Sequence, residues 1–173
     1  MGMDVYGLAP ADNKGEYFRN NVWYWHPLWD YCLDNHNDVV CDPNGEGHMN
    51  GGFSLDEYQS LTLGNRLLDD IENGKVEAYR IDYYALIADL PRVDCDLCGA
   101  TGIRTDKVGY DMGQPDKALS PEVAILVGRE FGWCNGCDGI GTREHFNANY
   151  PFDTENVREF AGFCIASGGF EIW

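Results

Sequence analysis

The sequence is poor in basic residues: 12 Lys and Arg stand against 29 Asp and Glu, and the formal net charge is −17. Proteins that bind nucleic acid through its phosphates concentrate Lys and Arg, and this chain has no such concentration. We therefore expect no direct binding to nucleic acid. The acidic residues are spread along the chain, which favours a solvated, solubilising surface. A second interpretation is a surface that imitates the phosphate backbone of DNA and occupies basic clefts of other proteins.

Long hydrophobic runs are also absent. No stretch of about 18 apolar residues occurs, so no membrane span is expected. The opening segment Met1–Asp4 has neither the charged nor the apolar region of a secretory signal, so no signal peptide is predicted. Four of the seven cysteines have metal-ligand spacing and three are scattered, which fits a reducing compartment better than an oxidising one. We expect a cytoplasmic protein.

Common catalytic motifs are missing as well. The sequence contains no Gly-x-Ser-x-Gly, no glycine-rich phosphate loop followed by Lys, and no His-Glu-x-x-His. Asp42, Asn44 and Glu46 have the spacing of calcium-loop ligands, but Phe53 stands at the twelfth position, where a bidentate acid belongs. The sequence therefore predicts no calcium site and favours a protein that is not an enzyme.

One pattern indicates a chemistry: two cysteine knuckles, each of the form Cys-x-x-Cys followed by glycines. Cys95 and Cys98 form the first knuckle, and Cys134 and Cys137 form the second. The second matches Cys-x-x-Cys-x-Gly-x-Gly in full, whereas the first has Ala100 at one glycine position. Such glycines permit positive φ and let backbone N–H groups approach the sulfurs. Four thiolates match the tetrahedral preference of a structural zinc ion, so we expect these four cysteines to bind one Zn²⁺.

Other roles for the four cysteines stay open. A redox dithiol is disfavoured, because neither pair has a thioredoxin-like βαβ context. An iron–sulfur cluster also uses four cysteines, and four free thiols are a further alternative. If Cys95 were not a ligand, His145, just past the second knuckle, is the residue expected to replace it.

A second candidate metal set lies nearer the N-terminus. Four residues there carry suitable side chains: Cys32, His36, Cys41 and His48. Cys32 and His36 are four positions apart, so a helix would place them on one face. Cys164, by contrast, is expected to be a buried core thiol on the apolar face of the last helix.

The fold class expected is α+β: a mainly helical small domain with short β-hairpins and a zinc-bound knuckle segment. A length of 173 residues, with 44% apolar and 13% aromatic residues, fits a single folded domain over residues 1–173. The knuckle segment covers residues 93–143 and includes a long insertion that is expected to form a loop or helical turn. The last helix is expected to be capped by Asp153 or Thr154 and to end at Gly168–Gly169.

The N-terminal part is predicted from its aromatic and turn residues. Val22–Trp25 is aromatic and β-branched, which predicts a short strand or a tightly packed turn. Pro27 then fits the first turn of a following helix. Residues 42–52 form a long turn-rich loop, which is either a binding surface or a connection between elements, and we favour the connection.

Two consecutive helices are predicted in the middle of the chain. The first begins at a capping box formed by Ser54 and Glu57 and ends at Asn73–Gly74. The second has apolar residues at helical spacing from Val76 until Pro91 stops it. Together they predict an antiparallel helical hairpin.

The knuckles resemble those of the cysteine-rich zinc finger of the DnaJ (Hsp40) chaperone family. That family's domain has four such repeats and two zinc ions, whereas this chain has two repeats, enough for one ion. The J-domain signature His-Pro-Asp is absent. The resemblance implies metal ligation by Cys95, Cys98, Cys134 and Cys137, and no chaperone activity.

Nearly the whole chain is similar to a group of small bacterial and phage proteins. The segments that carry this similarity are Met1–Gly7, Glu16–Trp23 and Tyr150–Ile172. The resemblance implies a prokaryotic or phage cytoplasmic setting and no particular mechanism.

The function expected from the sequence is that of a zinc-stabilised, acidic, non-enzymatic binding or structural protein. We expect it to bind a protein partner and to act as an adaptor, an inhibitor or a DNA mimic. The alternative is a zinc-containing hydrolase, which needs an open metal site and a nearby acid such as Glu144 or Asp138.

Overall fold

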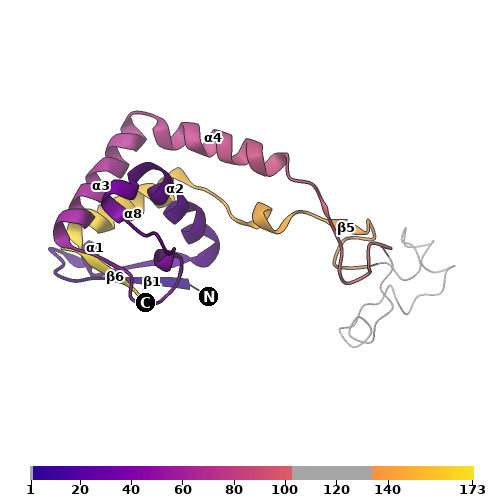
Figure 1. The fold of residues 1–173 in the computed structure, drawn as a ribbon, viewed down its shortest axis with the longest axis horizontal. Helices are drawn as coiled ribbons and strands as arrows, with labels where there is room; N and C mark the ends of the chain where they lie inside the picture. Colours follow the sequence, from indigo (N-terminus) through magenta and orange to yellow (C-terminus); the bar gives the residue numbers. More distant parts are fainter. Residues whose placement is uncertain (1, 103–133) are drawn as a thin grey trace. The chain divides into compact units, whose positions relative to one another are not determined.

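The computed structural model describes residues 2–102 and 134–173, and the chain divides into two compact units (Figure 1). Unit 1 comprises Met1–Ala88 and Asn149–Trp173, and unit 2 comprises Asp89–Ala148. Unit 1 mixes helix and sheet, which agrees with the predicted α+β class. The insertion predicted between the two knuckles falls on residues 103–133 and lies outside the described residues.

Unit 1 contains a four-stranded antiparallel sheet of order β2-β1-β6-β3. Its strands are β1 (Gly2–Gly7), β2 (Tyr17–Asn21), β3 (Ser54–Leu55) and β6 (Phe170–Ile172). The short helix α1 (Asn13–Glu16) connects β1 to β2. In the register, Val5 lies opposite Phe18 on one side and Ile172 on the other. The two ends of the chain therefore pair in the centre of one sheet.

Helix α2 (Val22–Val40) corrects the prediction for the N-terminal aromatic segment. Val22–Trp25 is neither a strand nor a turn, because the helix begins at Val22 and Pro27 lies inside it. The side chain of Asn21 caps the helix by accepting a hydrogen bond from the backbone N–H of Trp23. The apolar residues that are buried recur at helical spacing: Trp25, Leu28, Trp29 and Cys32. Their burial outweighs the β propensity of the first turn.

Helix α3 (Glu57–Glu72) ends at the predicted C-terminal residues, but its N-terminal cap differs from the prediction. Asn73 is the C-cap, as expected, whereas the N-terminal capping box is formed by Asp56 and Gln59. Ser54 belongs to β3, where it pairs with β6. The sheet thus uses the residue that the sequence pattern assigns to the cap.

Helix α4 (Lys75–Ala88) does not fold back along α3, so the predicted antiparallel hairpin is wrong (Figure 1). Helix α3 lies instead against α8 (Thr154–Ala166). A Cβ atom at Gly64 of α3 would lie 2.7 Å from the carbonyl oxygen of Ala161 of α8, so the close approach of the two helices requires glycine. Helix α4 fully buries only Val76.

Helix α8 confirms the predictions for the last helix. Asp153 is its N-cap and accepts a hydrogen bond from the backbone N–H of Glu155. The helix ends before Gly168 and Gly169, whose φ values are +63° and +92°. Cys164 is buried on its core face, and burial raises the pKa of this thiol well above its ordinary value.

The predicted turn-rich loop after α2 is confirmed, and it closes over the core of unit 1. The carboxylate of Asp42 accepts hydrogen bonds from the backbone N–H groups of Glu46 and Gly47 and from the indole of Trp29. A Cβ atom at Gly47 would lie 2.2 Å from the Trp29 ring. Asp42, one of the residues with calcium-ligand spacing, therefore orders the loop itself.

Candidate metal centre

A short hairpin brings the two knuckles of unit 2 together. Strands β4 (Val93–Asp94) and β5 (Thr142–Arg143) pair antiparallel, with Val93 opposite Arg143. Strand β4 leads directly into the first knuckle, and β5 follows directly after the second. The pairing of these two-residue strands therefore places the start of one knuckle beside the end of the other. A hydrogen-bonded ion pair between Arg143 and Asp96, 2.8 Å long, adds a further link.

The two knuckles have matching backbone hydrogen bonds. The N–H of Cys95 donates to the carbonyl of Gly141, and the N–H of Cys134 donates to the carbonyl of Gly102, both at 2.8 Å. Within each knuckle, the carbonyl of the first cysteine accepts a bond from the residue five positions on, Ala100 or Gly139. The knuckles are thus two copies of one local structure that face each other.

The positions predicted to need positive φ do adopt it. Gly139 has φ +73°, and Ala100, which replaces the glycine of the pattern, has φ +64°. A Cβ atom at Gly102 would lie 2.3 Å from the carbonyl oxygen of Gly139, and one at Gly141 would lie 2.4 Å from that of Ala100. Glycine is therefore required where the knuckles touch, and Ala100 holds a left-handed conformation that costs an L-residue about 1 kcal/mol.

The four sulfur atoms converge. All four lie within 4.8 Å of one another: those of Cys95, Cys98, Cys134 and Cys137. The distance is 4.0 Å between Cys95 and Cys134 and 3.7 Å between Cys98 and Cys137. A tetrahedral ion with Zn–S bonds of about 2.3 Å needs sulfurs roughly 3.8 Å apart, whereas a disulfide needs about 2 Å. The spacing therefore fits ligands around one metal ion. None of the seven cysteines forms a disulfide.

The ionisation of the four thiols depends on whether a cation is bound. Cys95, Cys134 and Cys137 are buried and Cys98 is partly buried. Burial, together with the neighbouring thiols, raises the pKa of the Cys134 thiol to about 12. A bound divalent cation reverses this effect, because it stabilises the thiolate form. The N–H of Gly141 donates to the sulfur of Cys137 at 3.2 Å, the kind of bond that tempers the charge of a metal-bound thiolate.

The other candidates near the knuckles lie outside the cluster. His145 is not needed as a substitute ligand, because Cys95 belongs to the sulfur group, and its Nδ1 accepts a bond from the N–H of Asn147. Asp138 and Glu144, the acids named for a hydrolase, have exposed side chains.

The second metal set does not assemble. Over residues 2–102 and 134–173, the four-cysteine cluster is the only group of three or more suitable side chains within ligand distance. Cys32 is buried in the core, and Cys41 is exposed at the C-cap of α2. His36 bonds to Asp70 and His48 pairs with Asp30. His36 leaves the helical conformation, with φ −135°, so it does not share a regular helix face with Cys32.

A buried carboxylate, Asp70, organises a network that the sequence analysis missed. It accepts hydrogen bonds from the hydroxyl of Tyr31 at 2.8 Å and from Nε2 of His36 at 2.9 Å, and it pairs with Lys75 at 2.9 Å. Burial opposes the ionisation of Asp70, but the bonds from Lys75 and Tyr31 outweigh it and hold its pKa below the ordinary value. Burial lowers the pKa of His36. The network ties α2, α3 and α4 together, and no local pattern distinguishes Asp70 from the neighbouring surface acid Asp69.

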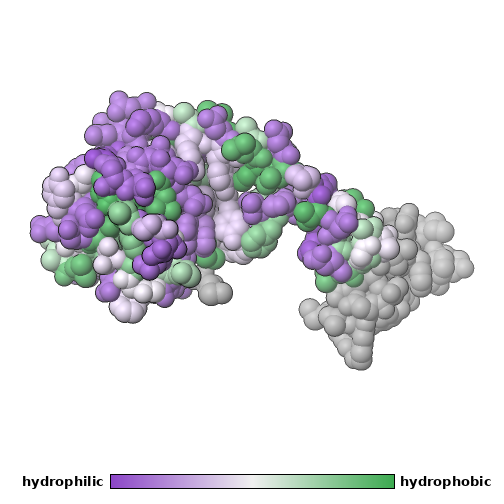
Figure 2. All heavy atoms as spheres, viewed as in Figure 1, coloured by the Kyte–Doolittle hydropathy of each residue, from purple (hydrophilic) through white to green (hydrophobic). Residues whose placement is uncertain are grey.

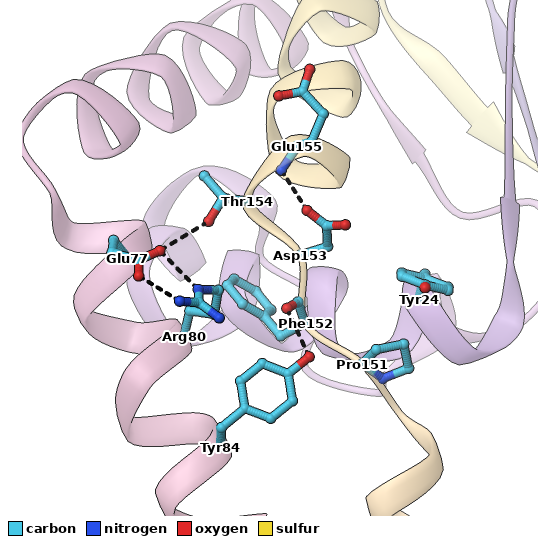
Figure 3. A pocket seen from close by; sticks show the side chains of 9 residues that line it. All are labelled: Tyr24, Glu77, Arg80, Tyr84, Pro151, Phe152, Asp153, Thr154 and Glu155. Carbon is cyan, nitrogen blue, oxygen red and sulfur yellow. Dashed lines mark hydrogen bonds and ion pairs between the residues drawn. The ribbon is translucent and has the colours of Figure 1, made fainter.

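An open hollow of unit 1 lies between α4 and the start of α8 (Figure 3). Its one cation, Arg80, bonds to both carboxylate oxygens of Glu77, at 2.6 and 2.8 Å. Thr154 also donates to Glu77, and the hydroxyl of Tyr84 donates to the carbonyl of Phe152. These polar groups bind one another, so the hollow offers no ready acid–base pair.

Comparisons of the chain with protein-family models, with curated proteins and with solved structures found no match. Among the residues that the structure describes, no helix has both the length and the apolar character that crossing a membrane requires.

Proposed function

We propose that this protein is a non-enzymatic binding protein whose knuckle unit is held together by one structural Zn²⁺. The observation that carries the proposal is the convergence of four cysteine sulfurs within 4.8 Å. Four protein sulfurs complete a tetrahedral set, and structural zinc sites are closed in this way, whereas catalytic sites keep a position for water. The hydrolase alternative would need one of the four sulfurs to leave the metal.

Zinc is the ion that this donor set favours. Soft thiolate ligands in tetrahedral geometry select zinc or iron. Iron–sulfur clusters place inorganic sulfide and more than one iron among their cysteines, whereas sulfurs as close as 3.7 and 4.0 Å fit a single ion. A single iron fits the same four sulfurs, and elemental analysis distinguishes it from zinc. The resemblance to the zinc finger of DnaJ proteins supports the same choice.

The charge of the chain supports a binding role with a protein partner. A net charge of −17 repels nucleic acid and attracts basic proteins. Hydrophilic residues predominate on the face of unit 1 around α2 and α3 (Figure 2). The similarity to small bacterial and phage proteins suggests an accessory protein of the prokaryotic or phage cytoplasm, acting as an adaptor, an inhibitor or a DNA mimic.

Elemental analysis of the purified protein, combined with a thiol count, tests the metal. We expect one zinc per chain and less than one tenth of that amount of iron. Cys137→Ser should lose the zinc, whereas Cys41→Ser, which changes an exposed cysteine outside the cluster, should retain it. A folded wild-type protein without metal, or equal zinc in both variants, would refute the proposal.

A further inference from the structure

The outward face of the four-stranded sheet carries an unusual set of side chains. The register places Tyr6 of β1 between Tyr17 of β2 and Glu171 of β6. One step along, Asp4 lies opposite Arg19, and the N–H of Trp173 donates to the carbonyl of Asp4 at 2.8 Å. Side chains alternate along a strand, so these residues share the face opposite to the buried core side chains. We name them the outer sheet face: Asp4, Tyr6, Tyr17, Arg19, Glu171 and Trp173.

Three of these side chains are exposed aromatic rings. The exposed fraction is 54% for Trp173, 46% for Tyr6 and 43% for Tyr17. The helices of unit 1 lie on the other side of the sheet (Figure 1). An antiparallel sheet with one solvated face normally places polar residues there. Tyr, Trp and Arg are instead the residue types enriched at protein interfaces and their hot spots.

Two of the rings are in contact, and the third lies at the end of the neighbouring strand. The centroids of Tyr6 and Tyr17 are 5.0 Å apart, and their planes are tilted by 36°. Trp173 follows directly after the segment of β6 that pairs with β1. The backbone bond from Trp173 to Asp4 keeps the third ring one strand away from Tyr6, so an extended segment that crosses β1 and β6 can reach all three rings.

The charges of the outer sheet face favour a cationic ligand. Arg19 is its one basic residue and pairs with Asp4 at 3.7 Å, and the hydroxyl of Tyr17 also donates to Asp4. Glu171 adds a second carboxylate beside Tyr6. Aromatic faces attract Lys and Arg side chains through cation–π interactions, and carboxylates pair with the same groups. Phosphates, in contrast, would meet two carboxylates and a chain of charge −17.

We propose that the outer sheet face binds a Lys- and Arg-rich segment of a partner protein. Guanidinium or ammonium groups of the partner lie over Tyr6, Tyr17 and Trp173, and pair with the carboxylates beside them. The proposal rests on the protein-binding role argued above, since it names the class of partner and the surface, but it is independent of the metal centre.

Fluorescence anisotropy with a labelled deca-arginine peptide and the zinc-loaded full chain tests this proposal. The double variant Tyr6→Thr/Trp173→Thr keeps the net charge and should weaken binding about tenfold, since each exposed cation–π contact is worth about two- to fivefold in affinity. The control Tyr58→Thr removes a ring that is 78% exposed on α3, away from the sheet, and should bind like the wild type. Equal affinity for all three proteins would overturn the proposal, because the peptide would then be held by net charge alone.

Amide and indole NMR shifts of the wild-type protein give a second readout that needs no variant. Addition of the peptide should shift signals of β1, β2, β6 and the Trp173 indole. Shifts confined to other elements would overturn the proposal, as would tighter binding of a labelled single-stranded deoxynucleotide decamer than of the peptide. The zinc content of each sample is measured separately. Absence of peptide binding to the outer sheet face in zinc-loaded protein would therefore contradict this proposal alone, whereas absence of zinc would contradict the proposed metal site.

Discussion

The sulfur atoms of Cys98 and Cys137 lie 3.7 Å apart, although 39 positions separate the two residues in the sequence. Bringing such distant segments together has a cost in chain entropy. Among the described residues of unit 2, the only buried cluster consists of three cysteines with the partly buried Cys98 packed against them, so little apolar surface offsets that cost. Binding to structural zinc sites is worth about 10–16 kcal/mol, which is comparable with the stability of a whole domain. We therefore propose that a bound metal ion is the main stabilising element of the two knuckles.

Removal of the metal should unfold the knuckles and leave unit 1 folded. The core of unit 1 contains none of the four cysteines and is built around Trp25, Trp29 and Phe160. Hydrogen exchange after treatment with a strong zinc chelator should show protection lost at Cys95 and Cys134, whose amides bond across the knuckles, and retained at residues of α3 and α8. Loss of protection throughout unit 1, or no loss in the knuckles, would contradict the account.

The two glycine positions Gly141 and Gly99 should respond differently to alanine. Gly141 has φ +88° and its added Cβ would meet the carbonyl oxygen of Ala100, whereas Gly99 has φ +57° and open space around its Cβ. Gly99→Ala should cost about 1 kcal/mol of zinc-dependent stability. Gly141→Ala should cost at least about 2–3 kcal/mol, since a clash adds to the strain. Competition with a chromogenic chelator measures the zinc affinity of each variant. Equal zinc affinities of the two variants would show that the knuckles do not touch as described.

Replacement of Asp70 should change both the stability of unit 1 and its response to acid. At neutral pH, Asp70→Asn should lower the free energy of unfolding by about 1–3 kcal/mol, because buried partners lose a charged acceptor. The pKa of Asp70 is below its ordinary value of 3.8 in the folded chain, so its ionised form stabilises the fold above that pH. This contribution to the free energy of unfolding is lost as the pH falls below about 4. Acidification should therefore lower the free energy of unfolding less in Asp70→Asn than in the wild type.

Urea unfolding followed by tryptophan fluorescence at pH 7 and pH 3 measures this difference. Asp69→Asn is the matched control, because it removes the same charge from the neighbouring, exposed position. It should retain the stability of the wild type at pH 7 and most of the wild-type loss on acidification. An Asp70 variant that behaves like the Asp69 variant would show that the buried network does not stabilise unit 1.

Local signals in the sequence predicted the elements that depend on local interactions. Asn73 and Gly74 ended α3 as expected, and Asp153 capped α8. The two knuckles were recognisable because each one fixes its own conformation within eight residues. Ser54 was misassigned as a cap, because its pairing with Glu171 is not visible locally.

The sheet and the polar network could not be predicted, because their partners are distant in the sequence. Val5 pairs with Ile172 across almost the whole chain, and the strands are too short for a clear alternation. Asp70 is buried by contacts to Tyr31 and His36 on another helix. The first turn of α2 was not predicted to be helical, because the burial of Trp25 in the core overrides the strand propensity of its neighbours.

X-ray absorption at the zinc edge tests the central claim most directly, because it reports the atoms bound to the metal. For the purified full chain, we predict one shell of four sulfur atoms at about 2.3 Å and no nitrogen or oxygen ligand. A shell that contains nitrogen or oxygen would indicate an open or different site. A folded protein with no zinc to measure would contradict the account altogether.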